Sequence, residues 1–189
     1  MKYVIDISDY QENIDFEEIV KAGVDGIIIK ISEGRSYTDN LWHFVGACKR
    51  LNLPVGFYCF SHATTTYEAI DEANEVIYLL STLDIDTSSI KLGLWYDVEA
   101  DEMFEDGIDT TAICSAFICA MNEAGYGNVG IYTSSLKCTD YMVNSIRPKF
   151  LADYVSYWIA DYRGFNEFAQ MYPDKHCSGW QYDAHGNIG

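Results

Sequence analysis

Residues 26–31 read Gly-Ile-Ile-Ile-Lys-Ile, an apolar run that only Lys30 interrupts. A run this short and this apolar is typical of a strand buried on both faces, as the strands of parallel sheets are. Similar runs recur along the chain, and a segment with apolar residues at helical spacing follows most of them. The expected strands are 3–7, 26–31, 53–60, 92–98, 128–132 and 155–160, with a further extended piece at 178–182. The expected helices are 15–23, 38–51, 66–81, 110–124 and 134–145.

This alternation of strands and helices predicts an α/β domain with a parallel sheet and right-handed crossovers. Periodicity alone leaves open whether the sheet is doubly wound or closed into a barrel. Neither GxGxxG nor GxxxxGK[ST] occurs, so the common phosphate-binding loops of open sheets are missing. A length of 189 residues indicates one domain, which we expect to span 1–189. The alternation fades after residue 161.

The composition excludes several classes of protein. With 49% hydrophobic and 22% charged residues, the chain is neither disordered nor fibrous. Twelve basic and 29 acidic residues give a net charge of −17, which argues against binding to nucleic acid or to an anionic membrane. No apolar run approaches the roughly 20 residues that span a bilayer. We expect a monomer with neither nucleic acid nor membrane as a partner.

Cysteine usage and the first residues bear on the compartment. The six cysteines form no CxxC pair and most lie in apolar stretches, so we expect reduced thiols packed in the core rather than disulfides or zinc ligands. The four histidines have no ligand spacing, and we expect neither a metal nor a cofactor. Residues 1–11 do not form a secretory signal, which indicates another export route or a leader removed beforehand.

The strongest candidates for catalytic residues follow the strand at 92–98. There, the apolar run Leu94-Trp95-Tyr96 leads into Asp97-Val98-Glu99. Side chains two apart on a strand share a face, so the two carboxyl groups should lie roughly 6–7 Å apart at the carboxyl end of the strand. Partial desolvation pushes the pKa values of such a pair apart, and one acid can then stay protonated, as glycoside hydrolysis requires. The alternative is a strand end with two solvated acids.

Two further strands bring acids to the same end of the sheet. Asp6 lies inside the first apolar strand, where a charge is costly unless it is paired or functional. Glu33 follows the second strand. Each acid alone is compatible with an ordinary strand terminus. Three strands that each place an acid at the same end of the sheet favour an active site.

Aromatic side chains gather at the same strand ends, and amphipathic rings suit the faces of sugars. These residues are Tyr58, Phe60, Trp95, Tyr96, Tyr132, Trp158, Tyr162, Trp180 and Tyr182. We expect Trp95 and Phe60 to belong to the core. His62 follows a strand and is more readily explained as a loop residue than as a substrate contact. No GxSxG motif indicates a serine nucleophile.

Seven motifs stand in the order found in one known family and cover nearly the whole chain: Asp6-Ile7-Ser8-Asp9-Tyr10-Gln11, Gly26-Ile27-Ile28-Ile29-Lys30-Ile31-Ser32-Glu33-Gly34, Gly56-Phe57-Tyr58, Tyr96-Asp97-Val98-Glu99, Gly130-Ile131-Tyr132-Thr133, Trp158-Ile159-Ala160-Asp161-Tyr162 and Trp180-Gln181-Tyr182. The chain resembles the glycoside hydrolase family 25 muramidases, the CH-type lysozymes. The resemblance implies a TIM-like (β/α)5β3 barrel and a peptidoglycan hydrolase. Such an enzyme cleaves the β-1,4 bond between N-acetylmuramic acid and N-acetylglucosamine with retention.

Carried over by motif, Glu99 is the general acid/base, Asp97 stabilises the developing positive charge, and Asp6 is a further acid of the site. The nucleophile, an enzyme carboxylate or the acetamide of the substrate, stays open. We expect substrate contacts from Glu33, Tyr58, Tyr132, Trp158, Gln181 and Tyr182. The implied partner is cell-wall peptidoglycan and the implied location is extracellular or in the cell wall, including release as a phage endolysin.

The end of the chain departs from the family pattern. Family members carry a Val-Asp-Leu-Asn-like strand shortly after Trp-Gln-Tyr, whereas this chain ends with residues 185–189. We therefore expect a truncated last strand, an unpaired sheet edge and no closing aspartate. Two other readings remain: a chitinase-like glycosidase, whose DxxDxDxE run is absent here, and a non-catalytic glycan-binding domain on a degenerate barrel.

Overall fold

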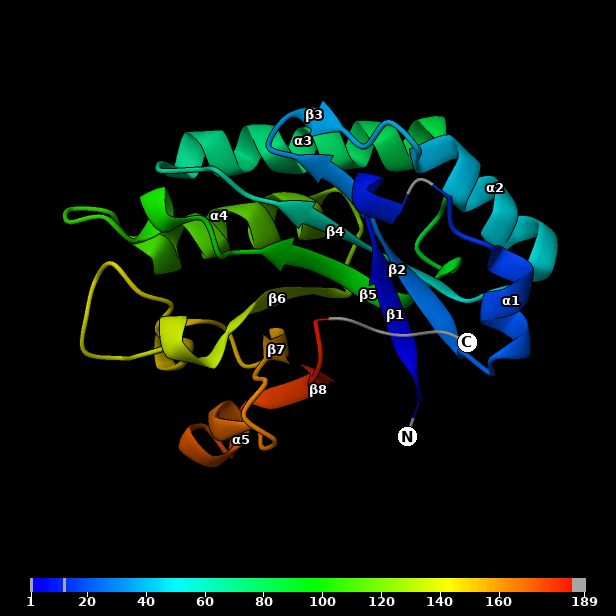
Figure 1. The fold of residues 1–189 in the computed structure, drawn as a ribbon. Coiled ribbons are helices and arrows are strands. Elements are labelled where there is room, and N and C mark those ends of the chain that lie inside the picture. The colour runs from blue at the N-terminus through cyan, green and yellow to red at the C-terminus, as the bar shows by residue number, and fades with distance from the viewer. Residues whose placement is uncertain (1, 12, 185–189) are drawn as a thin grey trace.

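The computed structural model describes residues 2–11 and 13–184 of the chain, and its centre is a curled parallel sheet (Figure 1). The strand order is β1-β2-β4-β5-β6-β7-β8, and the short β3 (Ser36–Tyr37) pairs antiparallel with the end of β2. The parallel strands are β1 (Val4–Ile7), β2 (Gly26–Glu33), β4 (Val55–Phe60), β5 (Ile90–Asp97), β6 (Val129–Ser134), β7 (Ser156–Ala160) and β8 (His176–Gln181). The predicted α/β architecture and its sequence of strands are confirmed.

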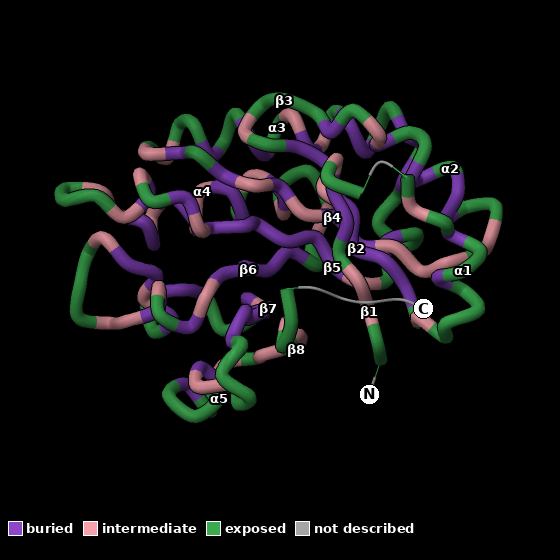
Figure 2. The backbone as a smooth tube through the Cα atoms, viewed as in Figure 1, coloured by how far each residue is buried: buried purple, intermediate pink, exposed green. Residues whose placement is uncertain are grey.

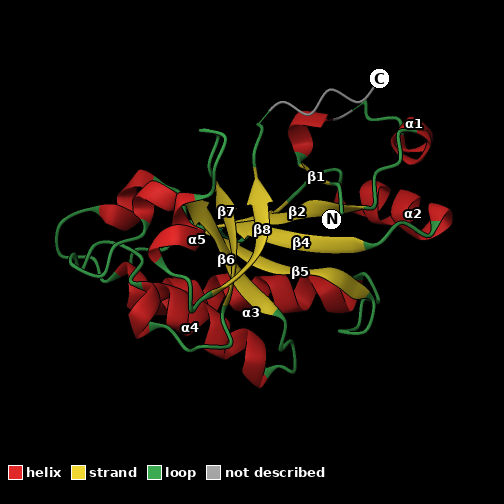
Figure 3. Cartoon of the chain, turned by 90° about the horizontal axis from the view of Figure 1, so that it is seen from below, coloured by secondary structure: helices red, strands yellow, loops and turns green. Residues whose placement is uncertain are grey.

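Helices follow β1, β2, β4 and β5 and return the chain along the outside of the sheet (Figure 3). They are α1 (Phe16–Lys21), α2 (Leu41–Leu51), α3 (Thr66–Thr82) and α4 (Thr110–Glu123). Side chains fix where they begin. Asp15 accepts hydrogen bonds from the first turn of α1, and Asp109 does the same for α4. Thr65 and Glu68 form a reciprocal capping box at α3.

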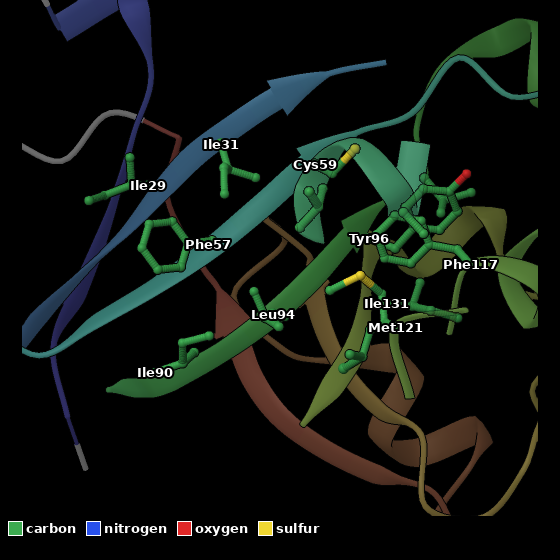
Figure 4. Close-up of a cluster of buried hydrophobic side chains, with 14 of the residues drawn as sticks. Ile29, Ile31, Phe57, Cys59, Ile90, Leu94, Tyr96, Phe117, Met121 and Ile131 are labelled. Carbon is green, nitrogen blue, oxygen red and sulfur yellow. The ribbon is translucent and has the colours of Figure 1, made fainter. Parts of the chain in front are cut away.

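β2 is buried on both faces, as the run at 26–31 predicts, whereas the edge strand β8 is partly exposed (Figure 2). The outer core lies between the sheet and the helices, and Tyr96 of β5 stacks there on Phe117 of α4 with ring centroids 3.9 Å apart (Figure 4). The inner core fills the curl of the sheet with Ile28, Trp95, Tyr132, Trp158 and Ala160. Successive residues of each strand point alternately into the outer core and the inner core. Residues on the inner face near the carboxyl ends of the strands therefore point toward the open end of the curled sheet.

The predicted helix at 134–145 is wrong. The chain forms a 3-10 turn at Ser135–Lys137, an isolated bridge between Cys138 and Ile146, and loop between them. This segment has no apolar face to bury, because Leu136, Tyr141, Met142 and Val143 are all exposed. The hydroxyl of Ser145 donates to backbone carbonyls of the same segment and stabilises the turn instead.

The sequence did not predict the strand β3, the short α-helix α5 (Glu167–Met171) between β7 and β8, or the 3-10 helices at Asp9–Gln11, Asp101–Phe104 and Pro148–Phe150. All six cysteines are free, and Cys48, Cys59, Cys114 and Cys138 are buried as expected, whereas Cys119 is exposed. The part of the chain that the structure describes has no helix long and apolar enough to cross a membrane.

The two ends of the sheet, β1 and β8, do not pair with each other within the described residues. The curl is therefore a half-barrel with an open side, and one side-chain hydrogen bond, from Gln181 of β8 to Asp6 of β1, spans that side. The expectation of a truncated closing strand concerns residues 185–189, which lie outside the described residues.

Candidate active site

A cleft of about 360 Å³ opens at the carboxyl end of the parallel strands, directly above the inner core. Its lining comes from elements far apart in the sequence, which the curl of the sheet brings together. The lining residues are Asp6, Ser8, Tyr10, Gln11, Lys30, Glu33, Tyr58, Phe60, Asp97, Glu99, Tyr132 and Trp158. The cleft thus gathers all four acids that the sequence singled out.

Asp97 and Glu99 occupy the end of β5 and the residues just after it. Asp97 continues the inner face of β5 above Trp95, and only 5% of its surface is exposed. Its Oδ1 atom has no hydrogen-bond partner among the described residues. Glu99 is half-buried and reaches the cleft more freely. The predicted pair of carboxyl groups therefore lies in one cleft, with Asp97 the deeper of the two.

Both carboxyl groups hold protons more tightly than ordinary acids do. Burial raises the pKa of Asp97 well above its usual value, and the charge of Glu99 raises it further, while Lys30 lowers it. Burial also raises the pKa of Glu99, partly offset by Lys137. The spacing predicted that one acid of the pair stays protonated, and the family resemblance gave the general-acid role to Glu99. The stronger rise in pKa belongs to Asp97, because Asp97 is the more deeply buried.

Asp6 stands at the open side of the cleft, where its side chain still reaches solvent. The surrounding protein raises the pKa of its carboxyl group, and the hydrogen bond from Gln181 lowers it. Gln181 Nε2 donates to Asp6 Oδ2 at 2.9 Å, and Gln181 Oε1 accepts from the hydroxyls of Tyr132 at 2.7 Å and Tyr162 at 2.5 Å. This chain of hydrogen bonds orients Asp6 from three strands on the far side of the gap.

The predicted aromatic residues divide into two groups. Tyr132 and Trp158 are mostly buried, lie with ring centroids 4.4 Å apart and form part of the cleft lining, as does the partly exposed Tyr58. Tyr182 is exposed, packs edge-on against Trp180 and lies outside the cleft lining. Trp95 belongs to the inner core as expected, and Phe60 both packs against the outer core and lines the cleft.

A row of alternating charges begins in the cleft lining at Lys30 and Glu33 and continues to His62 and Glu102 outside that lining. Glu33 contacts the ammonium group of Lys30 and lies 3.2 Å from Nε2 of His62, whose Nδ1 lies 2.5 Å from Glu102 Oε1. The two carboxylates raise the pKa of His62, with the hydrogen bond to Glu102 the larger cause. His62 lies in the loop after β4, as expected, and bridges Glu33 at the end of β2 and Glu102 in the turn after β5.

Sequence reasoning missed several residues of this site. Lys30 carried the same signal as Asp6, a charge inside an apolar strand, but was not singled out. Glu72 of α3 is buried and accepts hydrogen bonds from the Ser61 hydroxyl, the Tyr96 hydroxyl and the backbone N–H of His62. These bonds fix the loop that presents His62, and no local pattern in the sequence indicates them.

Comparisons of the sequence with known proteins identify its family. A family model described as Glycosyl hydrolases family 25 matches residues 5–189. The autolytic lysozyme of Clostridium acetobutylicum is 32% identical over 83 residues, which are 43% of this chain and 25% of that protein.

Solved structures support the same fold. The modular autolysin LytC of Streptococcus pneumoniae, in complex with a synthetic peptidoglycan ligand, superposes with a TM-score of 0.80 at 24% identity, over 99% of this chain and 43% of that one. A family 25 glycosyl hydrolase of Bacillus anthracis gives a TM-score of 0.77 at 19% identity, over 100% of this chain and 82% of that one. The match over almost the whole sequence shows that this chain belongs to glycosyl hydrolase family 25.

Proposed function

We propose that this chain is a peptidoglycan hydrolase that cleaves the β-1,4 bond between N-acetylmuramic acid and N-acetylglucosamine. The observation that carries the proposal is the pair of carboxyl groups with raised pKa values, Asp97 and Glu99, in a cleft that Asp6 also lines. A general acid needs a carboxyl group whose pKa is raised toward neutral pH, and burial raises the pKa of both groups in this direction. The similarity to an autolytic lysozyme and to an autolysin bound to a peptidoglycan ligand supports the proposal.

Glu99 is the proposed acid/base, because it is the more accessible member of the pair. Its carboxyl proton passes to the glycosidic oxygen as the bond to the anomeric carbon breaks. The ring then carries positive charge, which the carboxylate of Asp97 stabilises. In the second step, water attacks the anomeric carbon and returns a proton to Glu99, with overall retention. Either an enzyme carboxylate or the substrate acetamide holds the intermediate.

The wall of the cleft supplies the proposed substrate contacts. Tyr58, Tyr132 and Trp158 offer ring surfaces, the two tyrosines also offer hydroxyl groups, and Glu33 offers a hydrogen-bond acceptor. Gln181 orients the carboxyl group of Asp6 through its hydrogen bond to that group. Tyr182 would contact only a glycan that extends beyond the cleft. We further propose that 1–189 works as one monomeric domain on the cell wall.

The direct test is product analysis. Purified peptidoglycan is incubated with the protein, reduced with borohydride and analysed by mass spectrometry. Disaccharide fragments that end in reduced muramic acid support the proposal. Fragments that end in reduced glucosamine, or release from chitin alone, contradict it in favour of another glycosidase. Binding to walls in a pelleting assay, with no fragments released by a folded protein, identifies a glycan-binding domain instead.

A further inference from the structure

We propose that Lys30 is a positioning residue of this active site, whose ammonium group offsets part of the cost of burying Asp97 and so favours its negatively charged form. The inference rests on the proposed function and deepens it, since it names a cation that favours the ionised, stabilising form of Asp97. Lys30 lies near the end of β2 and Asp97 ends β5, and both side chains line the cleft.

The backbone places Lys30 on the inner face of the curled sheet. Ile28, two residues earlier on β2, belongs to the inner core, so Lys30 points the same way toward the cleft. Only 12% of the Lys30 side chain is exposed. Its ammonium group contacts Glu33 and lies 5.3 Å from the centroid of the Phe60 ring. Phe60 in turn is the register partner of Asp97 on β5.

The ionised form of Asp97 is stabilised by a nearby cation. A buried carboxylate with an unpartnered oxygen is costly to ionise, and a second carboxyl group two residues away adds to the cost. Of the described residues that line the cleft, Lys30 alone is a cation. The titratable groups that bear on Asp97, or on which Asp97 bears, are Asp6, Lys30, Glu33, Tyr58, Cys59, Glu99 and Tyr132.

Glu33 alone does not explain the position of Lys30. Glu33 is half exposed and already lies beside the His62 ring, so it has a second partner. An exposed ion pair adds little stability, whereas burial of a lysine stem among aromatic rings removes rotamer freedom and hydration. The ammonium group also has three donors, and Glu33 takes up only part of them. Glu33 and Phe60 therefore fix the ammonium group of Lys30 at the wall of the cleft, where its charge acts on Asp97.

The test is a carbon-13 NMR titration of the Asp97 carboxyl group. The parent protein carries Glu99→Gln, so that Asp97 titrates without its coupled neighbour, and Asp97→Asn assigns the signal. Lys30→Met is compared with Lys30→Arg, which keeps the charge, and with Lys30→Gln in case the methionine variant does not fold. Lys175→Met is the matched control, because Lys175 is another buried lysine bound to a carboxylate, Asp153, away from the cleft.

We expect the Asp97 midpoint to rise by about one pH unit in Lys30→Met or Lys30→Gln and to stay close to the parent in Lys30→Arg and Lys175→Met. In the active enzyme, the acidic limb of kcat/KM should move to higher pH in the same variants. An Asp97 midpoint that is unchanged without Lys30, or that moves equally in Lys175→Met, overturns the inference. The titration needs no catalysis, so a wild-type protein that releases no fragments contradicts the proposed function alone.

Discussion

At the scale of single residues, the active site contains groups that the fold would be more stable without. Asp97 is the clearest case, since it is buried, has an oxygen without a partner and has a raised pKa. Such destabilising groups are typical of functional sites, where a residue needed for activity can lower the stability of the fold. The same reasoning separates Asp97 from Asp161, another buried acid, whose pKa the Arg163 guanidinium lowers and which has several hydrogen-bond donors.

Asp97→Asn should therefore lower activity and raise stability. Because the folded-state pKa of Asp97 lies above its usual value of 3.8, wild-type stability is lost as pH rises from that value through the folded-state pKa. Asparagine has no such loss. We expect a gain on the order of 1 kcal/mol near neutral pH, absent near pH 3, and a fall in kcat of about 10²-fold. Thermal unfolding at the two pH values measures the first effect, and a variant less stable than wild type near neutral pH contradicts it.

His62 gives a prediction of the opposite sign. Its folded-state pKa lies above 6.5, so its bonds to Glu33 and Glu102 contribute stability fully below that pH and lose it as pH rises through the folded-state value. His62→Gln should therefore be more destabilising at about pH 6 than at about pH 9. Urea unfolding at both pH values measures this, with His176→Gln on β8 as the control. Equal destabilisation by His62→Gln at both pH values would contradict this prediction.

At the scale of elements, the sequence predicted what local periodicity controls and missed what depends on distant contacts. Buried strands such as β2 and amphipathic helices such as α3 were found because apolar spacing sets them. The helix at 134–145 was wrong, since its few apolar residues do not fall on one buried face. In the site, the acids were found from their place at strand ends. The bonds from Glu72 to Ser61 and from Gln181 to Asp6 join residues far apart in the chain, and no local pattern encodes them.

The start of α3 offers a test of local stabilisation. The Thr65 hydroxyl accepts from the backbone N–H of Glu68, and the Glu68 carboxylate accepts from the backbone N–H of Thr65. Thr65→Ala removes half of this capping box and should lower the free energy of unfolding by about 1 kcal/mol. Thr87→Ala, at an exposed loop position, should change it by less than about 0.5 kcal/mol. Similar urea midpoints for the two variants would show that the cap contributes nothing.

At the scale of the whole molecule, the charge of −17 acts against approach to an anionic cell wall. Added salt screens this repulsion, and at about 0.15 M the screening length falls to about 8 Å. Activity on intact walls should therefore increase with salt up to that concentration, while activity on short soluble fragments of the same glycan should change less. Turbidity clearing and fragment release across a salt series measure the two. A steep loss of activity on walls over this range contradicts the account.

The central claim is that the acids of this cleft cleave the muramic acid bond, with Glu99 as the proton donor. The most direct measurement is the rate of release of new reducing ends from purified peptidoglycan by wild type, Glu99→Gln and Glu102→Gln. The last is the matched control, since Glu102 is a nearby exposed glutamate bound to His62. We predict that Glu99→Gln slows release by about 10²–10⁴-fold while Glu102→Gln stays near wild type. A folded Glu99→Gln protein that works at the wild-type rate would contradict the account.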